Sequence, residues 1–127
     1  MQVEPRVIPV LLIADGRFVK TRCFSDPIYV GDPVNVLSIF NEFEVDEIIT
    51  LDISAAGSRT PQPLDSLRNY AEECFIPLAY GGGLTGLEQI GEVLRAGYEK
   101  IVVNSLLADQ PDVVESAADR FGSQAIV

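Results

Sequence analysis

The feature that most constrains the fold of this chain is the alternation of short apolar runs with longer segments of helical periodicity, from one end to the other. The short runs, at residues 6–13, 47–52, 76–80 and 100–104, predict β-strands. After each run, apolar residues recur with the spacing of one helix face, which predicts an amphipathic helix. Strands that alternate with helices predict a parallel sheet in which the helices form the crossover connections.

Turn and cap residues mark the ends of these segments. Asp15-Gly16 predicts a tight turn after the first strand, because such a turn needs residues that accept positive φ. A long loop is expected between this turn and the first helix, for which Asp32 is the expected N-cap. Thr85 and Glu88 have the spacing of a capping box, and Asp109 is the expected cap of the last helix. The apolar faces of the helices are expected to contain Val36, Leu37, Phe40 and Phe43; Leu64, Leu67, Ala71 and Cys74; Leu87, Ile90, Val93 and Leu94; and Val113, Val114, Ala117 and Phe121.

The length of each strand–helix unit indicates the architecture. It is typical of a (βα)₈ barrel, in which eight such units take about 250 residues. We expect residues 1–127 to form one domain of the α/β class: half of a (βα)₈ barrel, with four βα units and, at residues 123–127, the start of a fifth strand. A chain that stops on the first residues of a strand favours this reading. An open flavodoxin-like sheet is the structural alternative.

Composition narrows the range of partners and cofactors. The net charge of −10 and the sequence pI of about 4.2 argue against nucleic acid as a partner. The N-terminus lacks the pattern of a signal peptide, and no apolar stretch has the roughly 20 residues of a membrane helix. Histidine is absent, which removes His-based triads and most zinc sites, so we expect no metal and no cofactor. Cys23 and Cys74 lie outside any CxxC motif and are expected to be free thiols in a reducing cytoplasm.

A run of glycines is the first candidate binding site. Gly81, Gly82 and Gly83 follow a predicted strand and lead into a helix, an arrangement in which backbone amides and the helix N-terminus favour an anion. Asn104 and Ser105, after the next strand, would add donors to a phosphate-type site there. Two alternatives stay open. One is a strand-to-helix turn that only needs positive φ, and the other is a dinucleotide site, which lacks the expected acidic residue after the next strand.

Charged residues at the opposite ends of the strands form the second candidate. Arg6, Glu47 and Lys100 each stand at the amino-terminal edge of a predicted strand. If they point into a barrel, alternation along the strands gives that barrel an apolar lining with charges on its floor. Charges in such a place must pair, although solvated charges at helix-to-strand turns explain the same pattern. The lining would then contain Ile8, Val10, Leu12, Ile49, Leu51, Val102 and, at its far end, Asn104.

The carboxyl ends of the strands are where the catalytic groups of such barrels lie. Asp15, Lys20 and Asp52 are available there, so a carboxylate pair for acid–base chemistry would have to be Asp15 with Asp52. The Asp-Gly turn and a capping role explain these two residues equally well. The last inward position of the first strand holds Leu12, whose side chain exchanges no protons.

Several motifs along the whole chain together resemble one family. The motifs are Arg6-Val7-Ile8-Pro9, Asp15-Gly16-Arg17-Phe18-Val19-Lys20, Gly31-Asp32-Pro33, Asp46-Glu47, Leu51-Asp52-Ile53-Ser54-Ala55, Ile76-Pro77, Gly81-Gly82-Gly83, Gly97, Lys100, Val103-Asn104-Ser105 and Phe121-Gly122-Ser123-Gln124. None of them is specific alone, whereas the combination is highly specific. It resembles the cyclase subunit of imidazole glycerol phosphate synthase in histidine biosynthesis, and this chain resembles the N-terminal half of that subunit.

The resemblance implies a barrel subunit that works with a glutaminase partner docked on the N-terminal face of the barrel. Ammonia released by that partner crosses the barrel to a small phosphorylated or nucleotide-linked substrate at the C-terminal face. By resemblance, Arg6, Glu47 and Lys100 fall on three of the four positions of a charged ammonia gate; Gly82, Asn104 and Ser105 fall on one of two phosphate sites; and Lys20 falls on a loop lysine important for turnover.

One departure changes the expected chemistry. The family has its first catalytic aspartate at the position of Leu12, where its usual Cys-Leu-Asp run reads Val10-Leu11-Leu12 here. A kept gate with a lost catalytic acid resembles the degenerate paralogues associated with sugar amidation in bacterial surface polysaccharide pathways. We therefore expect a subunit that passes ammonia on for sugar amidation. The alternatives are a histidine-pathway cyclase and a non-catalytic half-barrel that serves only assembly.

A half-barrel is also expected to self-associate, because its inner face and sheet edges lack partners.

Overall fold

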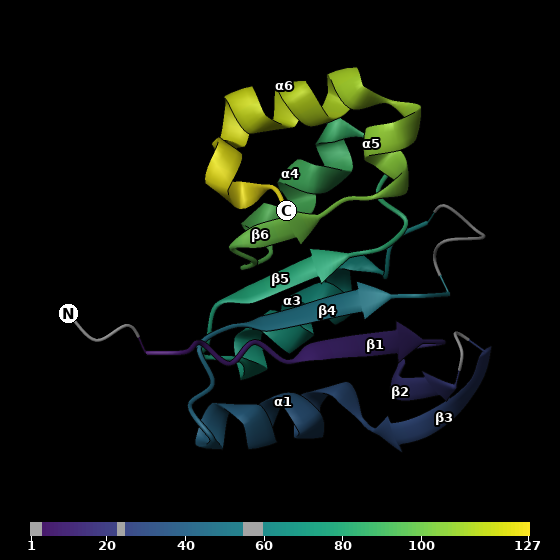
Figure 1. Cartoon of the computed structure of the whole chain (residues 1–127), viewed down its shortest axis with the longest axis vertical. Helices are drawn as coiled ribbons and strands as arrows, with labels where there is room; N and C mark the ends of the chain where they lie inside the picture. Colours follow the sequence, from purple (N-terminus) through teal and green to yellow (C-terminus); the bar gives the residue numbers. More distant parts are fainter. Residues whose placement is uncertain (1–3, 23–24, 55–59) are drawn as a thin grey trace.

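The structure is a computed structural model that describes residues 4–22, 25–54 and 60–127 (Figure 1). Strands and helices alternate along the described chain, as the sequence predicts. The strands are β1 (Val10–Ala14), β2 (Arg17–Arg22), β3 (Ser25–Gly31), β4 (Ile48–Asp52), β5 (Leu78–Gly81) and β6 (Lys100–Val102). The helices are α1 (Pro33–Glu42), α3 (Leu64–Glu73), α4 (Leu87–Arg95), α5 (Ser105–Asp109) and α6 (Pro111–Phe121), and a 3₁₀ turn, η1, covers Ser123–Ala125.

The sheet has the strand order β3-β2-β1-β4-β5-β6. In it β1, β4, β5 and β6 are parallel neighbours, and Figure 1 shows their arrows pointing the same way. Each parallel strand is added on the same side of the one before it. The helices pack in the same series, since α1 contacts α3, α3 contacts α4, and α4 contacts α6. The prediction of an α/β fold that forms half of a (βα)₈ barrel is confirmed, because a flavodoxin-like sheet reverses its direction of growth and has helices on both faces.

The two faces of the sheet differ in burial. Along β4, Ile48, Thr50 and Asp52 are buried, whereas Ile49 and Leu51 between them are only half-buried. Side chains of a strand alternate between faces, so the buried set packs against the helices and the other set lines the open face. The core lies between the sheet and the helices and contains, among others, Ile13, Leu37, Leu67, Ile90 and Ile101. On the open face, Val10 is 52% exposed.

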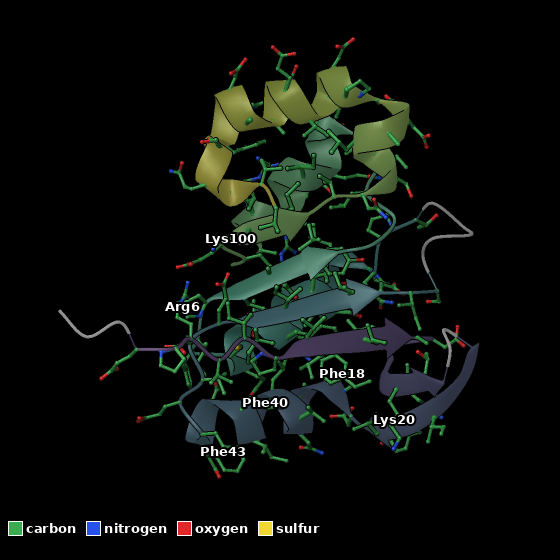
Figure 2. All side chains as sticks on the ribbon, viewed as in Figure 1. Arg6, Phe18, Lys20, Phe40, Phe43 and Lys100 are labelled. Carbon is green, nitrogen blue, oxygen red and sulfur yellow. The ribbon has the colours of Figure 1, made fainter. Side chains whose placement is uncertain are left out.

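The segment expected to be a long loop is a β-hairpin, so that prediction is wrong. Asp15 and Gly16 both have positive φ (51° and 76°) and form the predicted tight turn, across which Ala14 pairs with Arg17. A two-residue turn of this kind matches the twist of antiparallel strands, and β2 therefore folds back along β1. Phe18 of β2 is 1% exposed and anchors the hairpin in the core near α1 (Figure 2).

Other element boundaries also differ from the expectation. β1 begins at Val10, not at Arg6, although the carbonyls of Val7 and Pro9 already accept hydrogen bonds from the β4 side. The short helix α5 occupies the segment before Pro111, which makes Gln110 rather than Asp109 the N-cap of α6. Residues 123–125 form η1, and the sheet is reached only by the last two residues: Ile126 forms a parallel bridge with Ile101, and Val127 makes backbone hydrogen bonds with Ile101 and Val103.

Three smaller expectations are also resolved. Asp32 is the N-cap of α1 as predicted, although its side chain makes no cap hydrogen bond. The N-cap of α4 is Gly86, and Gln89 rather than Glu88 reaches back, because its Oε1 accepts a hydrogen bond from the Thr85 N–H at 2.7 Å. Phe43 follows the last residue of α1 and is 73% exposed, so it does not belong to the core face of that helix.

The expectation of free thiols can be compared with the structure at Cys74. Cys74 is a free, buried thiol whose Sγ lies 3.3 Å from the carbonyl oxygen of Ile76, and burial raises its pKa. Cys23 lies outside the described residues. Within the described ranges, no helix combines the length and the apolar character that crossing a bilayer requires.

Candidate functional site

A pocket of about 650 Å³ lies at the carboxyl ends of β4, β5 and β6. The structure brings together there most of the residues that the sequence indicated for a substrate site. They are Asp52, Gly82, Gly83, Asn104 and Ser105. Thr85, Asp109 and Gln110 also line this pocket and were not predicted as site residues. None of the described lining residues is Lys or Arg, so an anion bound here would depend on backbone amides and neutral side chains.

The conformation and the close packing of the glycine loop leave no space for side chains at Gly82 and Gly83. Gly82 and Gly83 have φ values of 128° and 70°, a region that other residues rarely adopt. A Cβ atom on Gly82 would lie 2.6 Å from the carbonyl oxygen of Asp52, and one on Gly83 would lie 2.5 Å from the carbonyl oxygen of Thr60. The loop therefore packs with its backbone directly against the end of β4 and the segment before α3. Both the positive φ and the close approach explain these glycines.

Asn104 and Ser105 enter the pocket from the next strand. Asn104 is the N-cap residue of α5, and its carbonyl accepts hydrogen bonds from the N–H groups of Leu107 (3.1 Å) and Ala108 (3.3 Å). The side chains of Asn104 and Ser105 are both exposed. Their polar groups are thus available to a ligand at the edge that also holds the glycine loop.

Asp52 is buried and bonded within the fold. Its Oδ1 accepts hydrogen bonds from the N–H (2.9 Å) and the hydroxyl (2.6 Å) of Ser54, and its Oδ2 accepts one from Nε2 of Gln62 (2.5 Å). Asp15 lies in the β1–β2 turn, away from the pocket lining, and its N–H donates to Oγ of Ser54 at 3.4 Å. Ser54 therefore connects the two carboxylate residues, and the turn geometry of Asp15 agrees with the structural explanation of that residue.

Leu12 stands in the row of inward residues next to the pocket. It pairs in register with Leu51, which pairs with Gly81, which pairs with Val102. Leu51, Gly81 and Val102 all line the pocket. An acidic residue at position 12 would thus lie on the inner surface beside the pocket, and leucine offers no such group.

Lys20 lies on the hairpin, paired with Ile28 across β2 and β3. It is not among the residues that line the pocket. Figure 2 shows it on the side of the molecule opposite to Arg6 and Lys100. It therefore belongs to the carboxyl-terminal side of the sheet, as expected, but on a separate projecting element.

The charged cluster at the other edge of the sheet is present as an ion-pair network. The Glu47 side chain is 6% exposed and accepts ion pairs from Nη2 of Arg6 at 3.4 Å and from Nζ of Lys100 at 3.1 Å. Arg6 is 59% exposed and Lys100 30%, so both cations cover a buried acid from the solvent side. Arg6 lies four residues before β1, Glu47 lies directly before β4, and Lys100 is the first residue of β6, so the cluster lies at the amino-terminal edge of the parallel strands. Figure 2 shows Arg6 and Lys100 near each other at this edge. In the structure these three charges are paired rather than separately solvated.

Tyr80 lies next to this site, outside the pocket lining, and was also not indicated by sequence reasoning. It is fully buried, and its hydroxyl accepts a hydrogen bond from the Gln62 N–H at 2.9 Å and donates one to the Gly82 carbonyl at 3.0 Å. Burial raises the pKa of Tyr80 to about 12. The available signal was a tyrosine inside an otherwise apolar buried strand, directly before the glycines, because a buried hydroxyl needs polar partners.

Known proteins resemble the chain over nearly its whole length. A protein of Leptospira interrogans, "Putative imidazole glycerol phosphate synthase subunit HisF", is 45% identical over 98% of this chain and 49% of its own length. "Putative imidazole glycerol phosphate synthase subunit hisF2" of Pseudomonas aeruginosa is 43% identical over 98% of this chain and 50% of its own. "Imidazole glycerol phosphate synthase subunit HisF" of Exiguobacterium sp. is 42% identical over 98% of this chain and 49% of its own length. The chain thus spans about half the length of the curated relatives it matches.

The family match agrees with the fold and with the two polar edges of the sheet. Residues 6–127 match the family described as "Histidine biosynthesis protein". The matched range starts at the arginine of the charged cluster and includes the glycine loop, Asn104 and Ser105. The chain belongs to the histidine biosynthesis protein family.

Proposed function

We propose that this chain supplies the first half of the barrel subunit of a glutamine amidotransferase complex, acting in the cytoplasm. The barrel receives ammonia from a glutaminase subunit at the edge that holds Arg6, Glu47 and Lys100. It holds a small phosphorylated or nucleotide-linked substrate at the opposite edge, in the pocket of Gly82, Gly83, Asn104 and Ser105. The observation that carries the proposal is the ion-pair network around the buried Glu47 at the amino end of an apolar inner face.

The inner face of the sheet, between the charged cluster and the pocket, is suited to the passage of a small neutral molecule. Val10, Ile49 and Ala79 lie in register in the same row as Lys100, and the next row holds Leu12, Leu51, Gly81 and Val102. Ammonia is small and uncharged, so an apolar lining lets it pass while it repels ions. Opposite charges at the entrance are stable only when they pair, and a lysine on a flexible stem is the member best suited to swing aside.

The kind of molecule that accepts the ammonia is inferred from the presence of leucine at position 12. The cyclase reaction of the family, by resemblance, needs an acid–base residue at this position, and leucine offers none. We therefore favour a barrel that passes ammonia on for the amidation of a surface-polysaccharide sugar. Lys20, Asp15 and Asp52 then contribute to substrate binding or to the hairpin over the site rather than to a proton-transfer pair.

The second candidate is the cyclase of histidine biosynthesis itself. It is favoured by the 42% identity to "Imidazole glycerol phosphate synthase subunit HisF" of Exiguobacterium sp.. Complementation of a histidine auxotroph by the full-length gene separates the two, since only a true cyclase restores growth. Loss of a general acid or base typically costs a factor of about 10² to 10⁴ in rate, so Leu12→Asp should raise ammonia-dependent cyclase activity if the rest of the site is sound.

The gate hypothesis is tested in the full-length protein with its glutaminase partner. Lys100→Ala and Arg6→Ala should leave glutamine hydrolysis largely intact and lower the ratio of ammonia delivered to glutamine hydrolysed. Glu47→Ala should do the same and also cost about 1 to 2 kcal/mol of stability, because two cations lose their counter-charge. The ratio is measured with the acceptor substrate present.

A matched control comes from the surface of α3. Arg68 pairs with Asp65 at 3.8 Å, and both side chains are well exposed. Arg68→Ala removes a cation from an ion pair far from the inner face and should leave the delivery ratio unchanged. If the gate variants keep full coupling and differ only in melting temperature, the cluster is structural and the channel proposal fails. A full-length protein that binds no glutaminase subunit would favour the third reading, a non-catalytic assembly module.

A further inference from the structure

Tyr80 occupies a buried position directly behind the pocket. It belongs to β5, one residue before the glycines, and its side chain has no exposed surface. Its ring packs edge-on against that of Tyr98, with ring centroids 6.1 Å apart and an interplanar angle of 73°. The ring is therefore held on the helix side of the sheet, and its hydroxyl is aimed at the loop that forms the pocket wall.

The hydroxyl of Tyr80 joins two segments that are separate in sequence. It accepts the hydrogen bond of the Gln62 N–H at 2.9 Å and donates its own proton to the Gly82 carbonyl at 3.0 Å. The side chain of Gln62 in turn donates to Oδ2 of Asp52 at 2.5 Å. The end of β4, the segment before α3 and the glycine loop are thus connected through one phenol group.

This hydrogen bond fixes the direction of a peptide group in the pocket wall. In a planar trans peptide the C=O and the following N–H point in opposite directions. Because the Gly82 carbonyl points to the Tyr80 hydroxyl, the Gly83 N–H points away from that hydroxyl, and Gly83 itself lines the pocket. Without the hydroxyl, a glycine pair with positive φ has other peptide orientations of similar energy.

We propose that Tyr80 is a positioning residue for an anionic, phosphate-type group of the substrate. Its hydroxyl holds the Gly82–Gly83 peptide so that the Gly83 amide is presented to the anion. The proposal rests on the proposed substrate pocket and adds a residue that never touches the ligand. It would supply an anion with a donor in a pocket whose described lining holds Asp52 and Asp109 but neither Lys nor Arg, because the amide is fixed before the ligand arrives.

The test compares two buried tyrosines in the full-length protein, with inorganic phosphate as the probe. The Tyr98 hydroxyl donates to the Leu67 carbonyl at 3.0 Å, away from the pocket lining. Tyr80→Phe and Tyr98→Phe each remove one buried hydroxyl and keep the ring, so both should lower the melting temperature. Only Tyr80→Phe should weaken phosphate binding, by about five- to tenfold, which corresponds to one hydrogen bond. Calorimetric titration gives the affinities, and amide NMR shifts of Gly82 and Gly83 report the loop.

The possible results distinguish a failure of the positioning role of Tyr80 from a failure of the proposed phosphate pocket. If the unmodified protein binds phosphate and Tyr80→Phe changes the affinity by less than about twofold, the positioning role is wrong while the pocket stands. If both variants weaken binding equally, the effect is general stability and the positioning role is again wrong. If the unmodified protein binds no phosphate and shows no shift of the Gly83 amide, both the phosphate pocket and the role of Tyr80 are overturned.

Discussion

Among single residues, the buried tyrosines have the clearest electrostatic signature. Burial raises the pKa of Tyr80 to about 12; the Gln62 N–H opposes this rise, and the nearby Asp52 adds to it. Burial also raises the pKa of Tyr98, with further contributions from Tyr70 and Tyr80. Both hydroxyls therefore stay protonated at neutral pH, because burial disfavours a phenolate and each hydroxyl donates its proton to a backbone carbonyl.

The pKa of Tyr80 predicts a loss of stability in alkaline solution. An unfolded tyrosine has a pKa of about 10, below the folded value, so the unfolded chain releases its proton first as the pH rises. The stability is full below pH 10 and should fall by about 2 to 3 kcal/mol between pH 10 and pH 12. Denaturant unfolding across this range should give a smaller fall for Tyr80→Phe. The exposed Tyr29 provides the control, since Tyr29→Phe should keep the full slope.

Sequence reasoning predicted which candidate residues meet at the pocket. Asp52 ends a strand and Gly82, Asn104 and Ser105 follow strands, and parallel strands bring their carboxyl ends to one edge, so their meeting was predictable. The hydrogen bonds of Tyr80 were not predictable, because its partner Gln62 lies eighteen positions away in sequence and no periodic pattern encodes a hydrogen bond to a backbone N–H. The contact of Asp52 with Gln62 was hidden for the same reason, whereas its bonds to Ser54 agree with the capping alternative.

At the scale of elements, the glycine loop makes the sharpest prediction. Gly83 has a φ of 70° and leaves no space for a Cβ beside Thr60, whereas a Cβ on Gly86 would meet nothing within 4 Å. Gly83→Ala should cost about 2 kcal/mol or more and weaken phosphate binding, because the loop has to move. Gly86→Ala, at the N-cap of α4, should cost about 1 kcal/mol at most and keep the affinity. Thermal unfolding and phosphate titration measure both. Equal effects of the two changes would contradict the close packing of the loop.

The hairpin shows where element prediction from sequence was incomplete. The Asp15-Gly16 turn was predicted correctly, and a turn with two positive φ values is itself a hairpin signal. The two strands that follow the turn, β2 and β3, were missed because their alternation is weak. β2 mixes the charged Arg17 and Lys20 with apolar residues, and β3 contains Pro27, which is tolerated only because β3 is an edge strand. The buried Phe18 is the residue that makes the hairpin part of the core.

At the scale of the whole molecule, topology was the most predictable level. Four strand–helix units in series allow few arrangements, since parallel neighbours need crossovers of one hand. A barrel and an open sheet differ in the direction in which successive strands are added, and sequence periodicity does not contain this direction. The strand order in the structure gives it, and the register places Val10, Leu12 and Leu51 on the open inner face.

This open face predicts that the 127-residue chain, produced by itself, associates. Ile8 and Val10 are 37% and 52% exposed, and together with the half-buried Leu12 and Leu51 they give this face a continuous apolar surface of the kind that marks an interaction site. Two copies that face each other would bury it and pair free sheet edges. Val10→Asp should weaken this association, because it places a charge in the contact. Ile39→Asp should not, because Ile39 is equally exposed (51%) but lies on α1, on the helix side. Sedimentation equilibrium at micromolar concentration measures both, and a clean monomer of the unmodified chain would refute the prediction.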